Sequence, residues 1–396
     1  MTVYDFDTII DRHGTGSLKY DCNDRYGKPE DILPLWVADM DFSVPEEVKQ
    51  ALRERVDHGI FGYTEPDDAY FQAVASWFER RHGWRPERAW LTTTPGVVYA
   101  LAMAVRAFTQ AGDAVLIQPP VYYPFKQEVE LNGRVLAEAP LSLDDDTLSY
   151  TIDFGEFERA IADNNVKLFI LCNPHNPVGR AWTQEELGRL ARICIDHDVI
   201  VVSDEIHADF AREGFKHTVF ASLSEEAALH CVVCTSATKS FNLAGLQASN
   251  IFIPNPELRE RFQHENAAAG YSQANILGMT ATRASYQAGE AWFDQLKCYL
   301  ESNYQFMVGY LRENVPSVRV APLESTYLVW VDCRAFGMNG DELQHFVEQE
   351  AKIWLDMGEM FGEQGAGFIR FNIACPRSVL TEALARFARA ARERGL

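Results

Sequence analysis

The chain has 396 residues, of which 47% are hydrophobic and 12% aromatic, and its formal net charge is -21. This much apolar material on a chain of this length predicts a large buried core divided between two domains. The negative charge argues against nucleic acid or an anionic membrane as a partner, because both attract basic surfaces.

Targeting signals and metal-binding patterns are missing from the sequence. The N-terminus has no basic stretch followed by an apolar one, and no apolar run reaches the length of a membrane span. The eight cysteines lie mostly in apolar runs, which is typical of buried side chains in a reducing compartment. Cys231 and Cys234 have a metal-like spacing, but no second pair follows at zinc spacing, so we interpret them as structural. We therefore expect a cytoplasmic protein without a metal site.

The first 285 residues predict an arm followed by a large α/β domain. Residues 1–45 show no clear sheet of their own and are expected to pack against the C-terminal part or a partner chain. From about residue 90, continuous apolar runs alternate with amphipathic helices, which indicates a mainly parallel sheet covered on both faces. Helices are expected from Pro95–Gly96 to about Gln110 and after Thr183, which has Glu186 three residues later as in a capping box. The expected strands cover residues 90–94, 114–118, 167–172, 199–203, 232–235 and 251–253.

After about residue 285 the pattern changes to mixed strands and helices. Helices are expected at residues 290–312 and 341–350, and strands at 326–331 and 367–372. A final helix places Leu380, Ala383, Leu384 and Phe387 on one face. This mixture predicts a smaller α+β domain. We therefore divide the chain into an arm (1–45), a large domain (46–285) and a small domain (286–396).

Three polar residues near strand ends suggest a cofactor site. Lys239 follows the apolar run 232–235, Asp204 ends the run 199–203, and Asn176 lies in an Asn-Pro loop. A strand-end lysine is usually exposed, and an aspartate or asparagine there often serves a turn or cap. Together, however, they supply an amine for an imine, a carboxylate for a pyridinium nitrogen and a donor for a ring oxygen. These are what pyridoxal phosphate requires.

The same site needs an anion-binding group, a ring-stacking group and a carboxylate-binding group. Tyr122, in a Pro-rich loop, can stack on a ring, and Arg370, between apolar residues of a strand, can grip a carboxylate with two parallel bonds. Each also has an ordinary structural interpretation. The candidates for the phosphate are the backbone of a helix start and one hydroxyl, namely Gly96, Val97, Val98 and Ser236.

With these residues in hand, the sequence resembles pyridoxal-phosphate enzymes of the aspartate-aminotransferase fold (fold type I) over essentially its full length. Within that fold it is most similar to the MalY/PatB group of cystathionine β-lyases and C–S lyases. The motifs that carry the resemblance are Leu33–Phe42, Phe61–Tyr63, Pro95–Val98, Asn173–Gly179, Ser203–Asp209, Ser236–Lys239, Leu243–Gln247 and Gly367–Pro376.

The resemblance implies a role for each candidate. Lys239 is then the Schiff-base lysine, Asp204 pairs with the pyridine nitrogen, and Asn176 lies near the ring oxygen and the substrate. Tyr122 then stacks on the ring, Arg370 binds the substrate carboxylate, and Trp36 lies in the stretch that shapes the substrate pocket. Tyr63 resembles the tyrosine that such enzymes send to the phosphate of a neighbouring subunit, which implies a homodimer with shared active sites.

Two positions depart from the general aminotransferase pattern. Gln247 stands where many aminotransferases have a phosphate-binding arginine, and His207 stands where many have a tyrosine that reaches the ring oxygen. Both departures weaken the case for an ordinary aminotransferase, and the glutamine is what the C–S lyase group tends to show. The resemblance therefore implies a C–S β-lyase, which would convert cystathionine or another cysteine S-conjugate to a thiol, pyruvate and ammonia. An aminotransferase and an added regulatory protein-binding role remain the alternatives, because one scaffold hosts several outcomes.

Overall fold

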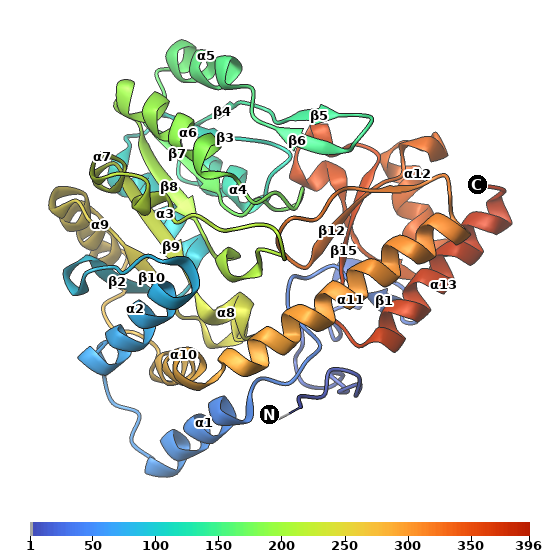
Figure 1. The fold of residues 1–396 in the computed structure, drawn as a ribbon, viewed down its shortest axis with the longest axis horizontal. Coiled ribbons are helices and arrows are strands. Elements are labelled where there is room, and N and C mark those ends of the chain that lie inside the picture. Colours follow the sequence, from blue (N-terminus) through green and yellow to red (C-terminus); the bar gives the residue numbers. More distant parts are fainter. Residues whose placement is uncertain (1–2) are drawn as a thin grey trace.

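A seven-stranded sheet forms the centre of the computed structural model, which describes residues 3–396 (Figure 1). All its strands run parallel except β10, which is antiparallel to both of its neighbours. The prediction of a mainly parallel α/β sheet is confirmed. In spatial order the strands are β2 (Leu91–Thr94), β10 (Ser249–Phe252), β9 (Cys231–Thr235), β8 (Ile200–Asp204), β7 (Leu168–Cys172), β3 (Ala114–Ile117) and β4 (Val135–Glu138).

Alternate side chains of the central strands enter two separate cores on opposite faces of this sheet. Leu168 and Ile170 of β7 pack in a cluster with α3 and α9, whereas Phe169 and Leu171 pack in a cluster with α5 and α6. Burial on both faces explains why these strands are continuous apolar runs. The helices of this part are α1 (Glu46–His58), α2 (Asp68–His82), α3 (Val97–Phe108), α4 (Pro124–Leu131), α5 (Phe154–Asn164), α6 (Gln184–Asp196), α7 (Glu225–Leu229), α8 (Ala237–Ser240), α9 (Pro256–Ala268) and α10 (Ile276–Ala288).

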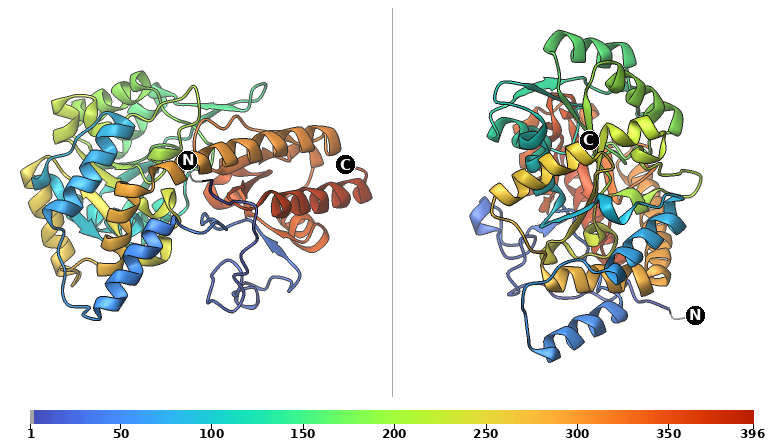
Figure 2. Two further views of the ribbon diagram at one scale, coloured as in Figure 1. Left: turned by 60° about the horizontal axis from the view of Figure 1, so that its bottom comes forward. Right: turned by 90° about the vertical axis from the view of Figure 1, so that its left-hand side faces the viewer.

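A second, antiparallel sheet lies toward the C-terminus. Helix α11 (Glu290–Asn314) runs from the side of the large sheet to this smaller one and packs there against α13 (Arg377–Arg394) (Figure 2). The helix predicted at 341–350 is α12 (Gly340–His345) followed by a π-helical turn at Phe346–Glu350. The strands of this sheet, in order, are β11 (Arg319–Val320), β12 (Leu328–Asp332), β15 (Phe368–Asn372) and β14 (Asp356–Met357).

The N-terminal arm packs against this second sheet. Two short strands, β1 (Leu33–Pro34) and β13 (Ile353–Trp354), pair in parallel, and the Asn372 amide donates to the Leu35 carbonyl at 2.9 Å. The sequence did not predict β1, nor the hairpin of β5 (Ser142–Asp144) and β6 (Ser149–Thr151). We keep the division at about residues 45 and 285 as a proposal.

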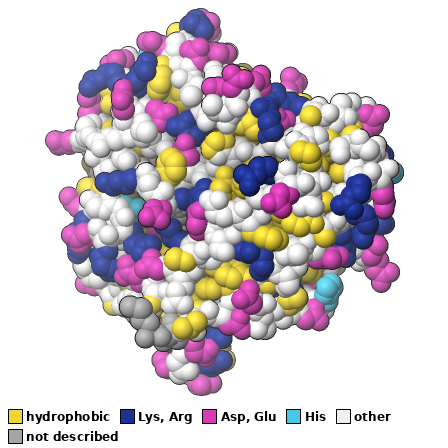
Figure 3. Space-filling model, turned by 45° about the vertical axis from the view of Figure 1, so that its right-hand side comes forward, with side chains coloured by type: hydrophobic (Ala, Val, Ile, Leu, Met, Phe, Trp, Pro, Cys, Tyr) yellow, Lys and Arg dark blue, Asp and Glu magenta, His cyan; other side chains and the backbone are white. Residues whose placement is uncertain are grey.

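Short helical turns complete the secondary structure. They lie at Asp24–Tyr26, Arg88–Trp90, Ala208–Phe210, Phe220–Ser222, Ala244–Leu246, Arg334–Phe336, Gly358–Phe361 and Glu363–Gly365. Within residues 3–396 no helix combines the length and apolar character that a membrane span requires. On the face shown in Figure 3, lysine and arginine side chains are interspersed with acidic ones.

Candidate active site

The carboxyl ends of neighbouring parallel strands surround a cavity of about 260 Å³. Asp204 ends β8, Asn176 lies in the loop after β7, and Lys239 lies on α8 just after β9. Crevices at the carboxyl ends of parallel strands are the usual binding sites of such sheets. The cavity is lined by Ala38, Pro95, Gly96, Val97, Val98, Tyr122, Cys172, Asn176, Asp204, Ile206, His207, Thr238, Lys239, Ala244 and Gln247.

The Lys239 amine is held at the arm and has an altered pKa. Its Nζ donates a hydrogen bond to the Ala38 carbonyl at 2.7 Å. Burial lowers the pKa of Lys239 to about 8, an effect that the nearby Asp39 carboxylate opposes. A lysine with this pKa is partly neutral near pH 7, as a nucleophile that forms an imine must be.

The Asp204 carboxylate is buried and sparsely bonded. It accepts a hydrogen bond from the Ile206 amide at 3.1 Å, and within residues 3–396 no other hydrogen bond or ion pair reaches it. Burial raises the pKa of Asp204 to about 7. One oxygen thus caps the following turn, and the other is free to accept a hydrogen bond from a protonated ring nitrogen. Asp204 can therefore serve both as a cap and as the partner of the pyridinium nitrogen.

Arg370 and Asn176 lie in direct contact. The guanidinium Nη1 donates to Asn176 Oδ1 at 2.8 Å, and Nη2 donates to the Trp36 carbonyl at 3.1 Å. Arginine can only donate, so this bond fixes the Asn176 amide with its oxygen toward Arg370 and leaves Nδ2 as a donor for a ring oxygen. Nη2 also forms a buried ion pair with Asp356. Asp356 was not among the predicted residues, although an acid directly after the apolar run 353–355 was a signal for it.

The region expected to hold a phosphate contains backbone groups at the start of α3 and the hydroxyl of Thr238. Gly96 is the N-cap of α3, and the cavity reaches the first helical residues, Val97 and Val98. Ser236 does not line the cavity. Its hydroxyl caps α8 by accepting from the Thr238 amide at 3.1 Å, and it lies 2.7 Å from the Ala248 carbonyl. Thr238 lines the cavity instead, and a phosphate contact of Ser236 stays a prediction.

The remaining candidates are divided between the cavity and its surroundings. Tyr122 and His207 line the cavity. Burial, helped by the positive charges of Lys239 and Arg370, holds the pKa of His207 well below its ordinary value. Trp36 lies outside the lining and stacks on Trp354 with ring centroids 4.3 Å apart. Tyr63 lies between α1 and α2, is 94% exposed and does not reach this cavity.

A larger cavity of about 540 Å³ lies beside α11, next to residues 210–215. Its cations are already engaged, since Arg212 pairs with Glu301 and Lys297 donates to the Ala211 carbonyl at 2.5 Å. Size alone therefore does not identify the active site, whereas the reactive groups of the smaller cavity do.

The comparisons with known proteins agree with this geometry. The sequence matches the family "Aminotransferase class I and II" over residues 30–387. It is 45% identical over 381 residues to cystathionine β-lyase PatB of Bacillus subtilis (strain 168), covering 96% of this chain and 98% of that protein. It is 32% identical to protein MalY of Escherichia coli (strain K12), covering 97% of each. The crystal structure of cystalysin from Treponema denticola, which contains a pyridoxal 5'-phosphate cofactor, superposes with a TM-score of 0.95 at 38% identity, covering 99% of this chain and 100% of that one.

The chain therefore belongs to the class I and II aminotransferase family. Within that family it is a pyridoxal-phosphate-dependent β-lyase. The residues fit the cofactor, since the cavity offers a partly neutral amine, a carboxylate with a free oxygen, an amide donor with a fixed orientation and a helix N-terminus.

The lowered pKa of Lys239 predicts how the apoprotein takes up its cofactor. Only the neutral amine attacks an aldehyde, and its fraction at pH 7 is roughly one tenth with a pKa near 8. The rate of pyridoxal phosphate attachment to the apoprotein should therefore rise through pH 8 and level off above about pH 9. Stopped-flow absorbance at several pH values measures this rate. A rate that keeps rising tenfold per pH unit up to pH 10 would show an ordinary lysine.

Proposed function

We propose that this lyase cleaves the β-carbon–sulfur bond of cystathionine or another cysteine S-conjugate and yields a thiol, pyruvate and ammonia. The observation that carries the proposal is the common anchoring of Lys239 and Arg370, which bond to the carbonyls of Ala38 and Trp36 in one short stretch of the arm. A substrate carboxylate on Arg370 then brings its α-carbon to the Lys239 amine. The name of the relative PatB, a cystathionine β-lyase, supports the substrate class.

The chain's own residues account for the proton transfers. Bound pyridoxal phosphate supplies an electron sink that acidifies the substrate's α-proton. Asp204 would keep a proton on the ring nitrogen, and Asn176 Nδ2 would donate to the ring oxygen. Arg370 orients the substrate through its carboxylate, and the Lys239 amine, released when the substrate amine binds, removes the α-proton. Loss of that proton allows the β-thiolate to depart and take up a proton as the thiol. The released 2-aminoacrylate then takes up water and yields pyruvate and ammonia.

Amino transfer at the same site is the second candidate, because the family to which the chain belongs is named for that reaction. In that reaction Lys239 would return the proton to the cofactor instead of allowing the thiolate to leave. Gln247 in the cavity wall weighs against it, since a neutral side chain stands where many aminotransferases have an arginine. A regulatory protein-binding role stays a prediction.

Product analysis separates these two reactions. With L-cystathionine and no added 2-oxo acid, the holoenzyme should release pyruvate and thiol in equal amounts. The Lys239→Ala variant should release neither, and Asp204→Ala should be slower by about a hundredfold or more, because the ring then loses its protonating partner. Lys126→Ala, which alters a half-exposed lysine on α4, is the control and should match the wild type. Amino transfer that requires a 2-oxo acid, without pyruvate release, would contradict the lyase.

We propose in addition that the enzyme is a homodimer whose partner supplies Tyr63. Ile60, Phe61 and Tyr63 are 66%, 56% and 94% exposed, and such a local cluster of exposed apolar and aromatic side chains indicates a covered surface. Lys239 is the only cation among the described residues that line the cavity. A phosphate in this cavity would therefore depend on neutral hydrogen-bond donors, and the Tyr63 hydroxyl of a second copy would add one.

Mixed dimers test this proposal. Tyr63→Phe chains and Lys239→Ala chains should each be less active alone, the second completely inactive. A mixed dimer should regain one normal site, because the Tyr63→Phe chain supplies Lys239 and its partner supplies Tyr63. Activity and cofactor affinity are measured after co-expression with two different tags and tandem purification. A mixed dimer with no more activity than its Tyr63→Phe chain contributes alone would contradict the shared site.

A further inference from the structure

The guanidinium of Arg370 is already occupied on the side that a carboxylate needs. It is 3% exposed and has five N–H groups, of which three are engaged. Nη1 donates once, to Asn176, whereas Nη2 donates twice, to the Trp36 carbonyl and to Asp356. Nε is buried and has no partner within residues 3–396.

The shape of a guanidinium limits how a second carboxylate can bind. A bidentate carboxylate needs two nitrogens on one edge of the planar group. The two available edges are Nε with Nη2 and Nη1 with Nη2, so both include Nη2. Nη2 has one N–H group on each edge, and these go to Asp356 and to the Trp36 carbonyl. A substrate carboxylate on either edge must therefore share Nη2 with these two acceptors or displace one of them, and Asp356 is the charged one.

Charge makes this sharing unfavourable. Asp356 on β14 faces Arg370 on β15 as a cross-strand pair, and both side chains are buried. Two carboxylates on one buried cation repel each other. Lys28 also acts on Asp356, but it is itself paired with Glu348 at 2.5 Å. Lys28 therefore offers little charge to offset a second carboxylate.

We infer that Asp356 competes with the substrate's carboxylate for Arg370 and thereby sets the affinity of the site for carboxylates. The inference rests on the proposed function, which places that carboxylate on Arg370. An amino acid binds through its weakened carboxylate contact and also through its amine, which the cofactor captures covalently. A 2-oxo acid has no amine of its own, so the weakened carboxylate contact lowers its affinity more. Asp356 therefore favours release of pyruvate over the second half of an amino transfer.

The Asp356→Asn holoenzyme tests the inference, because asparagine keeps the shape and one acceptor oxygen but removes the charge. We expect about tenfold lower KM for L-cystathionine, about tenfold lower Kd for L-alanine and about tenfold lower inhibition constant for pyruvate. A factor of ten is about 1.4 kcal/mol. The value of kcat should stay within about threefold. The Kd is measured from the change in cofactor absorbance as L-alanine, which has no thiol to lose, is added.

The opposite sign overturns the inference. If Asp356 only holds Arg370 in place, the substitution raises KM and both binding constants, and unchanged values also exclude competition. Asp332→Asn is the matched control, because it removes the charge of a buried aspartate paired with Arg319 and Arg334 on the same sheet, and it should leave the constants within about twofold.

Asp356→Ser is the second variant if the asparagine variant unfolds more readily, as measured by urea denaturation. It also removes the competing charge and should show the same direction of change. Binding of L-alanine does not depend on thiol release. A protein that binds L-alanine as expected but releases no thiol would therefore contradict the proposed function and leave the inference about Asp356 standing.

Discussion

The buried guanidinium of Arg370 joins the parts of the chain that meet at the active site. It lies on β15 of the small sheet and bonds to Asn176 from the large sheet, to the Trp36 carbonyl of the arm and to Asp356 on β14. A buried cation that loses its partners costs several kcal/mol, so these elements hold one another in place. The same group is the one that we propose as the binding partner of the substrate carboxylate. Structure and substrate recognition would then depend on one side chain.

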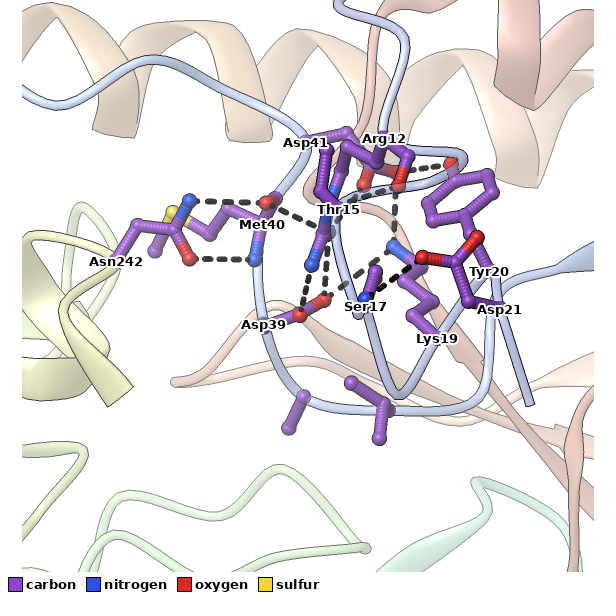
Figure 4. Close-up of polar contacts among 12 residues, drawn as sticks. Arg12, Thr15, Ser17, Lys19, Tyr20, Asp21, Asp39, Met40, Asp41 and Asn242 are labelled. Atoms are coloured by element: carbon purple, nitrogen blue, oxygen red, sulfur yellow. Dashed lines mark hydrogen bonds and ion pairs between the residues drawn. The ribbon is translucent and has the colours of Figure 1, made fainter. Parts of the chain in front are cut away.

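The arm contributes through its backbone. The Ala38 carbonyl accepts hydrogen bonds from Lys239 at 2.7 Å and from the Tyr327 hydroxyl at 2.9 Å, so the arm closes one wall of the cavity. The stretch that follows is fixed by charge, since the fully buried Lys19 pairs with Asp41 at 2.8 Å (Figure 4). Figure 4 also shows Asn242, only three residues after Lys239, bonded to the Met40 backbone. The arm and the lysine are thus positioned together.

The sequence predicted the groups whose side chains follow apolar strands. Lys239, Asp204 and Asn176 all meet at one cavity, because the carboxyl ends of parallel strands share an edge. The direction of β10 was not predictable, since an apolar run looks the same in either direction. Ser236 and Thr238 are two residues apart with similar chemistry, and only the geometry of the α8 cap shows which of them faces the cavity.

Two contacts of the site could not be predicted from the sequence, for physical reasons. A backbone carbonyl such as that of Ala38 leaves no mark in the sequence, because any residue provides one. Asp356 belongs to a two-residue strand, and its pairing with Arg370 is created by the register of β14 and β15. Tyr63 was found through resemblance alone, and its partner-dependent role remains a proposal.

Substitution of Arg370 by glutamine tests the central claim most directly, because it keeps a donor but removes the charge. The account predicts that the variant still binds pyridoxal phosphate with its normal absorbance. It also predicts that the Kd for L-alanine rises about a hundredfold, with the loss of the charged bidentate contact. A variant that binds L-alanine with the wild-type Kd would contradict the assignment of Arg370 as the carboxylate-binding group.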